Sequence, residues 1–339
     1  MNYLEDYNHK VFFELNTNRE KILFLLEYAI RAPSTHNSQP WLFKVKNSSC
    51  EVYFNPAKKL PEADTTMRDL FISIGCCVEN LIIAAQSFGV YDSHSILFDK
   101  KTRKIAEVRF NIISRKNIHL DEKCINAILT RSNRRGFYSN RKITNALIIK
   151  LNKSAKEFGE LQYDAVIKRR LREKIVALTA TGLGLAYKNY QFRFEMSRWF
   201  IPNNSQRKEG IPGYAINFPL LISMIFPFVV RFIDIGPIVS KLNKKSMISA
   251  PLISVISIKN ESKEKWVNVG MLAQKQIIDL KKEGISSAVY VASIEMGDLR
   301  SQLKKILGLR DEPQFLFCSG YMSGCARLTP RHSVISKLI

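Results

Sequence analysis

Acidic residues are scarce in this chain relative to basic ones. Its 339 residues include 30 Asp and Glu against 52 Lys and Arg, a formal net charge of +22. Such an excess predicts attraction to polyanions, whether nucleic acid, an anionic membrane or phosphorylated ligands. The basic residues are scattered, and no recognised DNA- or RNA-binding motif accompanies them. We therefore expect no nucleic-acid partner, and a Lys-rich surface without a specific partner is the alternative explanation of the charge.

Paired cysteines and metal-ligand patterns are also lacking. The six cysteines form no CxxC pair, and Cys76 and Cys77 are adjacent within an apolar helical pattern. The five histidines are dispersed without metal-ligand spacing, so no metal site is expected. The start of the chain, MNYLEDYNHKVFFEL, lacks the basic residues and apolar core of a signal peptide. These features together predict reduced thiols in a cytoplasmic protein.

Apolar runs long enough to cross a bilayer are not evident either. Residues 218–230, FPLLISMIFPFVV, are almost wholly apolar, but Pro219 and Pro227 interrupt a run of only 13 residues. We expect a buried or lid-like segment here, within an apolar insertion at about 200–248. Peripheral membrane contact through 218–230, helped by the positive charge, and a true transmembrane helix are the alternatives.

The remaining composition is that of an ordinary globular protein. Hydrophobic residues make up 46% of the chain and charged residues 24%, which gives no sign of disorder, collagen or a coiled coil. The length allows one large domain or two medium ones with a sizeable core.

Residues 1–125 predict a first unit that mixes helices and strands. A helical pattern over 18–31 ends at an Ala-Pro step, because the residue before a proline disfavours helix. Residues 67–90 predict a long buried helix that ends at Gly89. Strands are expected at WLFKVKN, CEVYFNP, HSILFDK and IAEVRFNII.

Residues 126–339 predict a second unit whose order is similar to that of the first. Helical patterns occur at 145–158 and, after the strand-like LQYDAVI, through 200, and a second long helix at 266–285 ends at Gly284. Strands are expected at LQYDAVI, SAPLISVISIK and QFLFCSGYM. We interpret this order as a divergent internal duplication. Two unrelated α+β segments would give a similar pattern and are the alternative.

The segment RAPSTHNSQPW, residues 31–41, is a poor helix and a poor strand. Its prolines interrupt regular structure, and most of its other residues carry polar side chains. Ser34, Thr35, Asn37 and Gln39 place short hydrogen-bonding groups on a non-helical backbone. Such a loop can contact the edge of a heterocycle or the hydroxyls of a ribityl chain. An ordinary helix-to-strand connection is the alternative.

The segment TRSNRRGF, residues 130–137, concentrates positive charge before a Gly-Phe turn. On an extended backbone alternate side chains point the same way, so Arg131, Asn133 and Arg135 can converge on one anionic ligand. Guanidinium groups bind phosphate through two parallel hydrogen bonds, and small polar side chains donate to the remaining oxygens. A solvated basic turn is the alternative.

The two segments together resemble those of the nitroreductase superfamily of FMN-dependent oxidoreductases. That family carries Ala-Pro-Ser-x-x-Asn-x-Gln-Pro-Trp after a helix, and APSTHNSQPW matches each specified position. It also carries an FMN-binding Arg-x-Ser-x-Lys/Arg-x-Phe segment, and RSNRRGF is similar except that Asn133 replaces the usual Ser. Ordinary members have the arginine segment first and form obligate dimers that build two FMN sites from both subunits.

Here the order is reversed, which resembles the twin-domain, Acg-like branch of the family. The first unit carries the Ser/Asn segment and the second carries the arginine segment. The stretches PAKKLPEADTTMRDLFISIGCCVENL, FRFEMSRWF, DEPQFLFCSGY and TPRHSVISKL also resemble that branch. The resemblance implies an α+β, nitroreductase-like fold in which tandem duplicated units, 1–125 and 126–339, form an intramolecular pseudo-dimer. One complete FMN site would then lie at the interface of the two units.

The resemblance also implies which residues contact FMN. The expected contacts come from both units and the tail: Pro33, Ser34, Thr35, Asn37, Gln39, Arg131, Ser132, Asn133, Arg135 and Arg331. Arg331 would take the phosphate. Ile294, Glu295 and Met296 fall where the family has a loop whose backbone N–H groups face flavin N5, although Met296 replaces a glycine. An ordinary loop acid is the alternative for Glu295, and no catalytic acid or base is nominated because the flavin carries the chemistry.

Two functions follow from the resemblance. One is NAD(P)H-dependent reduction of a nitroaromatic, quinone or similar small acceptor through bound FMN. The other is FMN storage or sequestration under a lid at about 200–248, without nitroreductase turnover. The chain is expected to work as a monomeric pseudo-dimer or as a homodimer.

Overall fold

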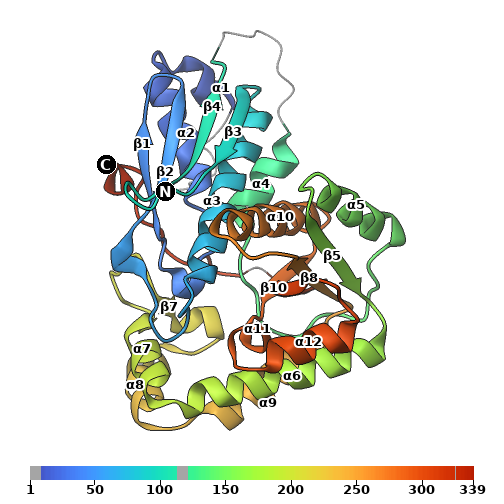
Figure 1. Cartoon of the computed structure of the whole chain (residues 1–339). Helices are drawn as coiled ribbons and strands as arrows, with labels where there is room; N and C mark the ends of the chain where they lie inside the picture. The colour runs from blue at the N-terminus through green and yellow to red at the C-terminus, as the bar shows by residue number, and fades with distance from the viewer. Residues whose placement is uncertain (1–8, 113–120, 325) are drawn as a thin grey trace.

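Two antiparallel four-stranded sheets organise the molecule (Figure 1). The computed structural model describes residues 9–112, 121–324 and 326–339. The first sheet has the order β1-β2-β4-β3, and its strands are β1 (Trp41–Val45), β2 (Ser49–Phe54), β3 (Tyr91–Ile96) and β4 (Lys104–Phe110). The second has the order β5-β8-β10-β9, and its strands are β5 (Leu161–Val166), β8 (Leu252–Ile258), β9 (Ser286–Val289) and β10 (Glu312–Gly320). The observed class is α+β, as predicted.

The two sheets follow the same plan along the chain. In each, two strands precede a long central helix and two strands follow it, and the spatial order is first, second, fourth, third. The central helices are α3 (Arg68–Ser87) and α10 (Lys263–Lys282). The second half differs by an insertion, residues 167–251, between its first and second strands. The insertion contains the helices from α6 to α9, and the apolar stretch expected at about 200–248 is part of it. This common plan supports a duplication, and the boundary between residues 125 and 126 stays a prediction.

The other helices cover the sheets or build the insertion. Around the first sheet and at its exit lie α1 (His9–Glu14), α2 (Asn18–Ala29) and α4 (Glu122–Thr130). The second half contains α5 (Asn145–Lys156), α6 (Arg169–Lys188), α7 (Tyr190–Trp199), α8 (Leu220–Phe232), α9 (Gly236–Ser249), α11 (Ala292–Glu295) and α12 (Leu299–Leu307). A short parallel pair, β6 (Phe200–Ile201) with β7 (Ile211–Pro212), lies within the insertion.

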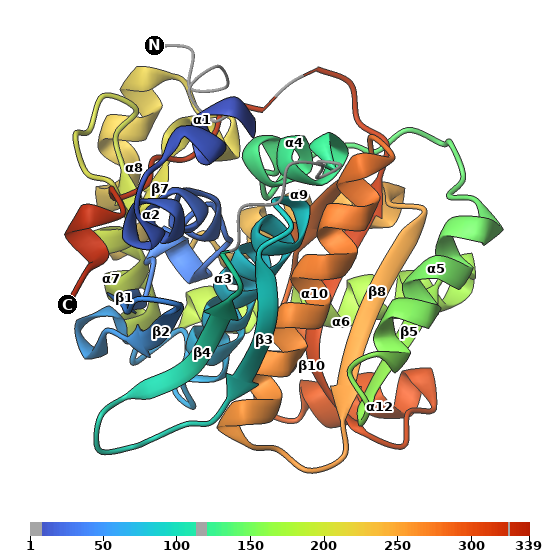
Figure 2. The ribbon, with the colours of Figure 1, turned by 90° about the horizontal axis from the view of Figure 1, so that it is seen from above.

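The central helices α3 and α10 pack side by side between the sheets (Figures 1 and 2). A Cβ atom built on Gly75 would lie 2.0 Å from the carbonyl oxygen of Val267, and one built on Gly270 would lie 2.0 Å from that of Ile72. Only glycine therefore permits this separation of the two backbones. In the same buried interface the Gln274 amide donates to Asn80 Oδ1 at 2.6 Å. Each helix thus supplies core to the other half.

The C-terminal tail returns to the first half of the chain. Leu338 forms a parallel bridge with Phe43 of β1, and the Ile339 N–H donates to the Phe43 carbonyl at 2.9 Å. Figure 1 shows the C-terminus beside β1. The tail therefore places residues near 331 against the first half, although they follow the second half in the sequence.

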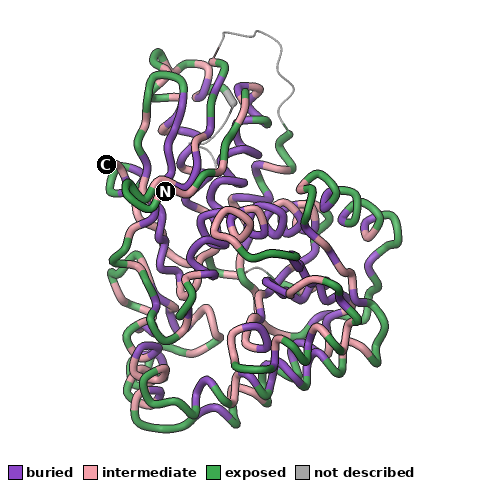
Figure 3. The backbone as a smooth tube through the Cα atoms, viewed as in Figure 1, coloured by how far each residue is buried: buried purple, intermediate pink, exposed green. Residues whose placement is uncertain are grey.

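The apolar segment at 218–230 is not buried, so that part of the sequence-based expectation is wrong. It forms most of α8, in which only Ser223 and Val230 are buried, and α9 follows at a bend of 119°. Figure 3 shows mainly exposed and intermediate residues at this end of the molecule, where Figure 1 places α8. Of the described helices, α3 is long and apolar enough to cross a membrane, but 94% of its apolar window is buried as core.

Adding one methyl group at the contact between α3 and α10 should strongly destabilise the fold. Gly270→Ala should lower the free energy of unfolding by about 2–4 kcal/mol, because the new Cβ meets backbone that cannot rotate away. Gly184→Ala is the matched control, since this glycine also lies in a helix and a Cβ there meets only the Ser240 hydroxyl at 3.3 Å. Urea denaturation measures both, and equal effects would contradict a backbone-limited contact.

Candidate functional site

A cavity of about 690 Å³ lies where the two halves meet. Its walls come from the segment after α2, the first turns of α3, residues 131–137, and the stretch between β9 and α12. The insertion and the C-terminal tail close further sides. Of the residues expected at a cofactor, Pro33, Ser34, Thr35, Asn37, Arg131, Ser132, Asn133, Arg135, Glu295, Met296 and Arg331 line this cavity. Gln39 and Ile294 are not among its lining residues.

The segment at 34–39 turns sharply because three of its residues adopt left-handed backbone conformations. His36, Asn37 and Gln39 have φ values of 54°, 56° and 50°. Non-glycine residues rarely adopt this region, and such strain of about 1–3 kcal/mol per residue concentrates at functional sites. The Ser34 hydroxyl supports the turn by accepting from the Gln39 N–H at 2.9 Å. The sequence predicted a loop here but not its left-handed backbone.

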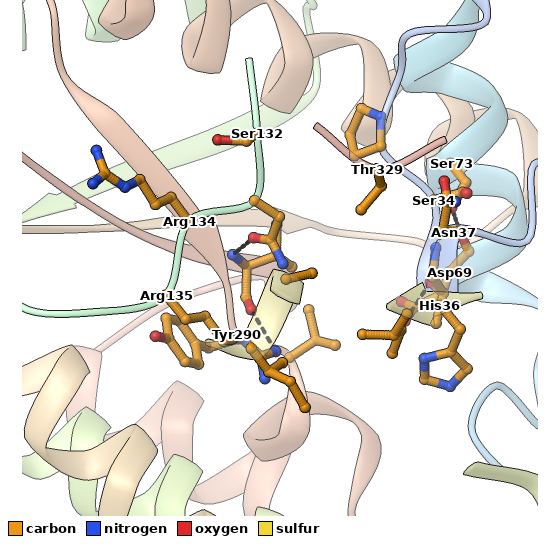
Figure 4. A pocket seen from close by; sticks show the side chains of 18 of the residues that line it. Ser34, His36, Asn37, Asp69, Ser73, Ser132, Arg134, Arg135, Tyr290 and Thr329 are labelled. Atoms are coloured by element: carbon orange, nitrogen blue, oxygen red, sulfur yellow. Dashed lines mark hydrogen bonds between the residues drawn. The ribbon is translucent and has the colours of Figure 1, made fainter. Parts of the chain in front are cut away.

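His36 is a cavity residue that the sequence prediction missed. The residue is half-buried, and its Nε2 atom is buried without a hydrogen-bond partner. Burial, with a smaller effect of the Arg135 charge, lowers the pKa of His36 to about 4. The imidazole is therefore neutral at physiological pH, with a polar ring atom left unsatisfied. In Figure 4 it lies with Ser34, Asn37, Asp69 and Ser73 on the same side of the cavity.

The amide side chains of the segment hold the C-terminal tail. Asn37 Oδ1 accepts from Arg331 Nη1 at 2.8 Å, and Asn37 Nδ2 donates to the Pro330 carbonyl at 3.1 Å. Gln39 is fully buried, and its Oε1 atom accepts from the His332 N–H at 2.9 Å. Gln39 therefore holds the tail, and its predicted contact with a cofactor stays a prediction.

Three arginines gather at one part of the wall. Arg131 Nη2 donates to the Arg31 carbonyl at 3.0 Å, and Arg331 donates from Nη2 to the same carbonyl at 3.4 Å. In the described part of the chain none of the three forms a salt bridge with a carboxylate. The Nε atoms of Arg31 and Arg131 are buried without a hydrogen-bond partner. We call Arg31, Arg131 and Arg331 the arginine cluster.

Neutral oxygen atoms, rather than carboxylates, surround the arginine cluster in the described chain, and Arg331 alone donates to five backbone carbonyls and to the side chains of Asn37 and Thr329. Burial lowers the pKa of Arg131 to about 10. Burial first, and then repulsion from Arg131 and Arg31, lowers the pKa of Arg331 to about 9. A buried cation without a counter-ion is costly, so folded proteins normally supply an acidic partner. The cluster therefore has the electrostatics of a site for an anionic group.

Arg135 lies at a different part of the wall from the arginine cluster. Its Nη2 atom donates to the Val289 carbonyl at 3.2 Å, and its guanidinium carbon lies 4.9 Å from the centre of the Tyr290 ring. Asn133 Oδ1 accepts from the Val289 N–H at 2.8 Å. Figure 4 shows Arg135 beside Tyr290, while Arg134 extends away from them. Arg131 and Arg135 line one cavity but have different partners, so their alternation along the sequence does not bring them to a single point.

An acidic cluster at the start of α3 forms a further part of the wall. Asp69 is buried, accepts from the Thr35 hydroxyl at 3.4 Å and leaves its Oδ1 atom without a partner. Burial, with the charges of Glu295 and Asp64, holds the pKa of Asp69 well above its usual range. Arg68, which is also buried, forms a salt bridge with Glu295. The Asp69 carboxyl is therefore harder to ionise than that of an ordinary aspartate, and it carries an unpartnered oxygen at the cavity wall.

One sequence feature could have indicated that Asp69 lies at the cavity. Arg68 and Asp69 are two adjacent charged residues at the start of a mostly apolar helix. Glu295 is the last residue of α11 and pairs with Arg68, and its contact with a cofactor stays a prediction. Ile294 beside it is buried in the core of the second half. In the described residues no group of three His, Cys, Asp or Glu side chains is placed to hold a metal.

The insertion supplies apolar and aromatic cover for the cavity. Tyr187, Phe192, Met196, Phe200 and Tyr214 line it from this side. The Tyr214 hydroxyl donates to the Leu328 carbonyl at 3.1 Å, which joins the insertion to the tail. Tyr138 and Tyr190, two other tyrosines of the second half, do not line the cavity.

Comparison with known proteins gives a short sequence match. No family model matches the chain. The curated "Putative NAD(P)H nitroreductase Rv3131" of Mycobacterium tuberculosis strain H37Rv is 36% identical over 70 residues, which are 21% of this chain and 20% of the relative. The corresponding protein of strain CDC 1551, "Putative NAD(P)H nitroreductase MT3217", matches with the same values. The match therefore spans about a fifth of the length of these curated relatives.

Solved structures of nitroreductases also align with the chain. An FMN and NADPH-dependent nitroreductase, NfnB from a Sphigopyxis strain, aligns with a TM-score of 0.43 at 15% identity and covers 63% of this chain and 96% of its own. The FMN-dependent NfnB of Mycobacterium smegmatis, solved with NADPH, aligns with a TM-score of 0.42 at 14% identity over the same shares. TM-scores below 0.5 do not by themselves establish a common fold.

The sequence match is therefore the finding that bears on the predicted resemblance. The 36% identity over 70 residues occurs in a chain that also carries the APSTHNSQPW segment. Placement in the twin-domain, Acg-like branch stays a prediction. The match shows that about a fifth of the chain is similar to proteins named as NAD(P)H nitroreductases.

Proposed function

We propose that this chain is an FMN-binding oxidoreductase that uses NAD(P)H to reduce a nitroaromatic, quinone or similar small acceptor. The observation that carries the proposal is the arginine cluster, in which buried Arg131 and half-buried Arg31 and Arg331 line a cavity without a carboxylate partner in the described chain. The curated relatives are named as NAD(P)H nitroreductases, and aligned structures are described as FMN-dependent. These names agree with the chemistry of the site.

The donor set of the cavity fits FMN. Its phosphate would be held by Arg131 and Arg331, because a dianion would accept from the unpaired Nε atom of Arg131 and offset the repulsion between the guanidinium groups. The amides and hydroxyls at 34–37 supply short donors and acceptors suited to a ribityl chain. Arg135, packed on Tyr290, would bring a positive charge to the ring system. When bound, FMN supplies the hydride- and electron-transfer chemistry, and the protein supplies orientation and electrostatics.

Side chains of the cavity would set the polarity around the isoalloxazine ring of bound FMN and limit the access of water to it. Asp69 would take up a proton more readily than an ordinary aspartate, since burial and the charges of Glu295 and Asp64 raise its pKa. His36 would remain a neutral polar group, because its pKa is lowered to about 4. Phe192, Met196 and Phe200 would exclude water from the side of the insertion. A dry cavity strengthens the electrostatic interactions within it.

We also propose that 1–125 and 126–339 are duplicated units that build one site per chain. The common strand order of the two sheets and the paired central helices support this division. The Ser/Asn segment comes from the first unit, and Arg131 and Arg135 come from the second. The chain would thus contain both halves that ordinary family members assemble from two subunits.

A second candidate function is storage of FMN under a cover formed by the insertion. The observation that favours it is the apolar and aromatic wall from Tyr187 to Ile216, which occupies one side of the cavity. If this wall covers the isoalloxazine ring of FMN, the nicotinamide of NAD(P)H cannot stack on the flavin. Reduction of the bound flavin distinguishes the two functions.

Arg331→Gln should weaken FMN binding selectively. We expect a loss of about 10–100-fold in affinity, since a charge-assisted hydrogen bond contributes about 1.5–3 kcal/mol. Riboflavin, which lacks the phosphate, should bind the wild type and the variant almost equally. Fluorescence titration of both ligands measures this difference, and Arg331→Lys should restore part of the preference for FMN.

Arg109→Gln is the control for this experiment. Arg109 lies on β4 with its side chain 61% exposed and does not line the cavity. This variant should bind both ligands like the wild type. An equal loss of FMN and riboflavin in Arg331→Gln would mean that the residue only anchors the tail, and the phosphate assignment would fail.

Anaerobic addition of NADPH and then NADH should bleach the bound flavin. The reductase account predicts loss of the visible flavin bands with at least one nucleotide, followed by reoxidation when a quinone is added. Absorbance in a sealed cuvette measures both steps. Bands that persist with both nucleotides but bleach with dithionite would contradict the reductase and favour storage.

A further inference from the structure

We propose that the hairpin of α8 and α9 is a docking surface that binds the interface of an anionic lipid bilayer. The two helices form one end of the molecule, away from the first sheet (Figure 1). This inference goes beyond the proposed redox function and does not depend on FMN binding. It depends on the exposure, charge and geometry of residues 220–245.

Exposed apolar side chains are concentrated on this hairpin. Ten of the nineteen exposed large hydrophobic residues described by the structure lie within 220–242. They are Leu220, Leu221, Ile222, Met224, Ile225, Phe228, Phe232, Ile233, Ile238 and Leu242. The remaining nine are spread over the rest of the described chain. Isolated exposed apolar residues are normal, but a contiguous set on one surface marks an interaction site.

The apolar face of α8 is not needed for its packing on the protein. The inner side of the helix is held by buried Ser223 and Val230, and by Phe226, whose ring centre lies 4.8 Å from that of Phe200. The outer side carries Leu221 and Phe228, which are 77% and 68% exposed. A surface helix of a protein without a partner normally turns polar residues outward. The outer face of α8 therefore fits an apolar environment.

The charges around this face are complementary to anionic headgroups. Residues 211–258 contain four basic residues and one acid, a net charge of 4 − 1 = +3. The basic residues are Arg231, Lys241, Lys244 and Lys245, and the three lysines are exposed. The acid, Asp234, accepts from the Gly236 N–H at 2.8 Å and so serves the turn between the helices. Two copies of this face would bring like charges together, which favours lipid over a second copy as the occupant.

The dimensions of the hairpin fit a position on a bilayer better than one across it. Thirteen residues of α8 extend about 20 Å, whereas a hydrocarbon core is about 30 Å thick. The bend of 119° to α9 prevents the two helices from forming one straight span. An apolar face flanked by lysines is the pattern of a helix that lies in the plane of the interface.

Docking by this face would set one wall of the cavity beside the membrane. Tyr214, Ile216 and Asn217 line the cavity, and α8 begins three residues later at Leu220. An apolar acceptor dissolved in the bilayer would then be close to this wall. That consequence rests on the proposed reductase, whereas membrane binding itself does not.

Vesicle co-sedimentation of the full chain tests the proposal. Vesicles of phosphatidylcholine, with and without phosphatidylglycerol, are compared at low and high salt. We expect binding to the anionic vesicles at low salt, and a marked decrease at high salt because screening weakens the lysine contacts. Absence of binding to anionic vesicles at low salt would overturn the proposal.

Two matched double variants distinguish binding through the apolar face of α8 from attraction of the whole positively charged protein to anionic vesicles. Leu221→Ser with Phe228→Ser should lower the vesicle partition coefficient by about tenfold or more, since both apolar side chains leave the interface. Leu97→Ser with Ile149→Ser removes side chains of similar exposure, 71% and 68%, from other surfaces and should bind like the wild type. Equal binding by the two double variants would assign the attraction to net charge alone and overturn the proposal.

Sedimentation velocity distinguishes a second copy of the chain from lipid. If the wild type is a dimer that Leu221→Ser with Phe228→Ser converts to a monomer, and anionic vesicles do not compete with dimer formation, the face is a protein interface and the proposal is wrong. We expect no such change of mass. Flavin absorbance recorded on the same samples reports failure of the proposed cofactor site separately.

Discussion

The contact between α3 and α10 is the constraint on which the rest of the structure depends. Gly75 and Gly270 let the two backbones approach until a single methyl group would overlap a carbonyl oxygen. This approach fixes how the two sheets lie relative to each other, because each central helix also belongs to the core beneath its own sheet. It thereby positions the first turns of α3, with Asp69 and Ser73, opposite the arginines of the second half.

The site formed in this way contains more buried charge than the protein itself neutralises. The acids Asp64, Asp69 and Glu295 surround Arg68, while the arginine cluster has no carboxylate partner in the described chain. Separating buried acids from buried bases is costly for a fold. The cost is offset when an anion occupies the arginine cluster, so the electrostatics favour a bound anion even though family names alone would not place one there.

The sequence predicted the secondary structure and the two cavity segments because both depend on local patterns. Apolar periodicity identified the central helices, and Pro, Ser and Asn clusters identified the loop at 31–41. It did not predict the role of Gln39, because the partner of that side chain, His332, is 293 residues away. It also did not predict Arg31 or Asp69 as cavity residues, since only the packing of α2 and α3 turns them inward.

For the apolar segment at 218–230, the sequence predicted an apolar environment but not its location. Its composition indicates an apolar environment, and burial in the protein was the expected one. The insertion instead uses Phe218, Phe226 and Val230 for its small core and leaves the other side of α8 exposed. Hydrophobicity predicts that a segment avoids water, but not which partner covers it.

The measurement that tests the central claim most directly is the flavin content of the purified chain. After incubation with excess FMN and gel filtration, absorbance gives the flavin concentration and amino-acid analysis gives the protein concentration. One complete site built by the two units of each chain predicts one FMN per chain. No retained flavin would contradict the cofactor site, and two FMN per chain would contradict its construction from both units.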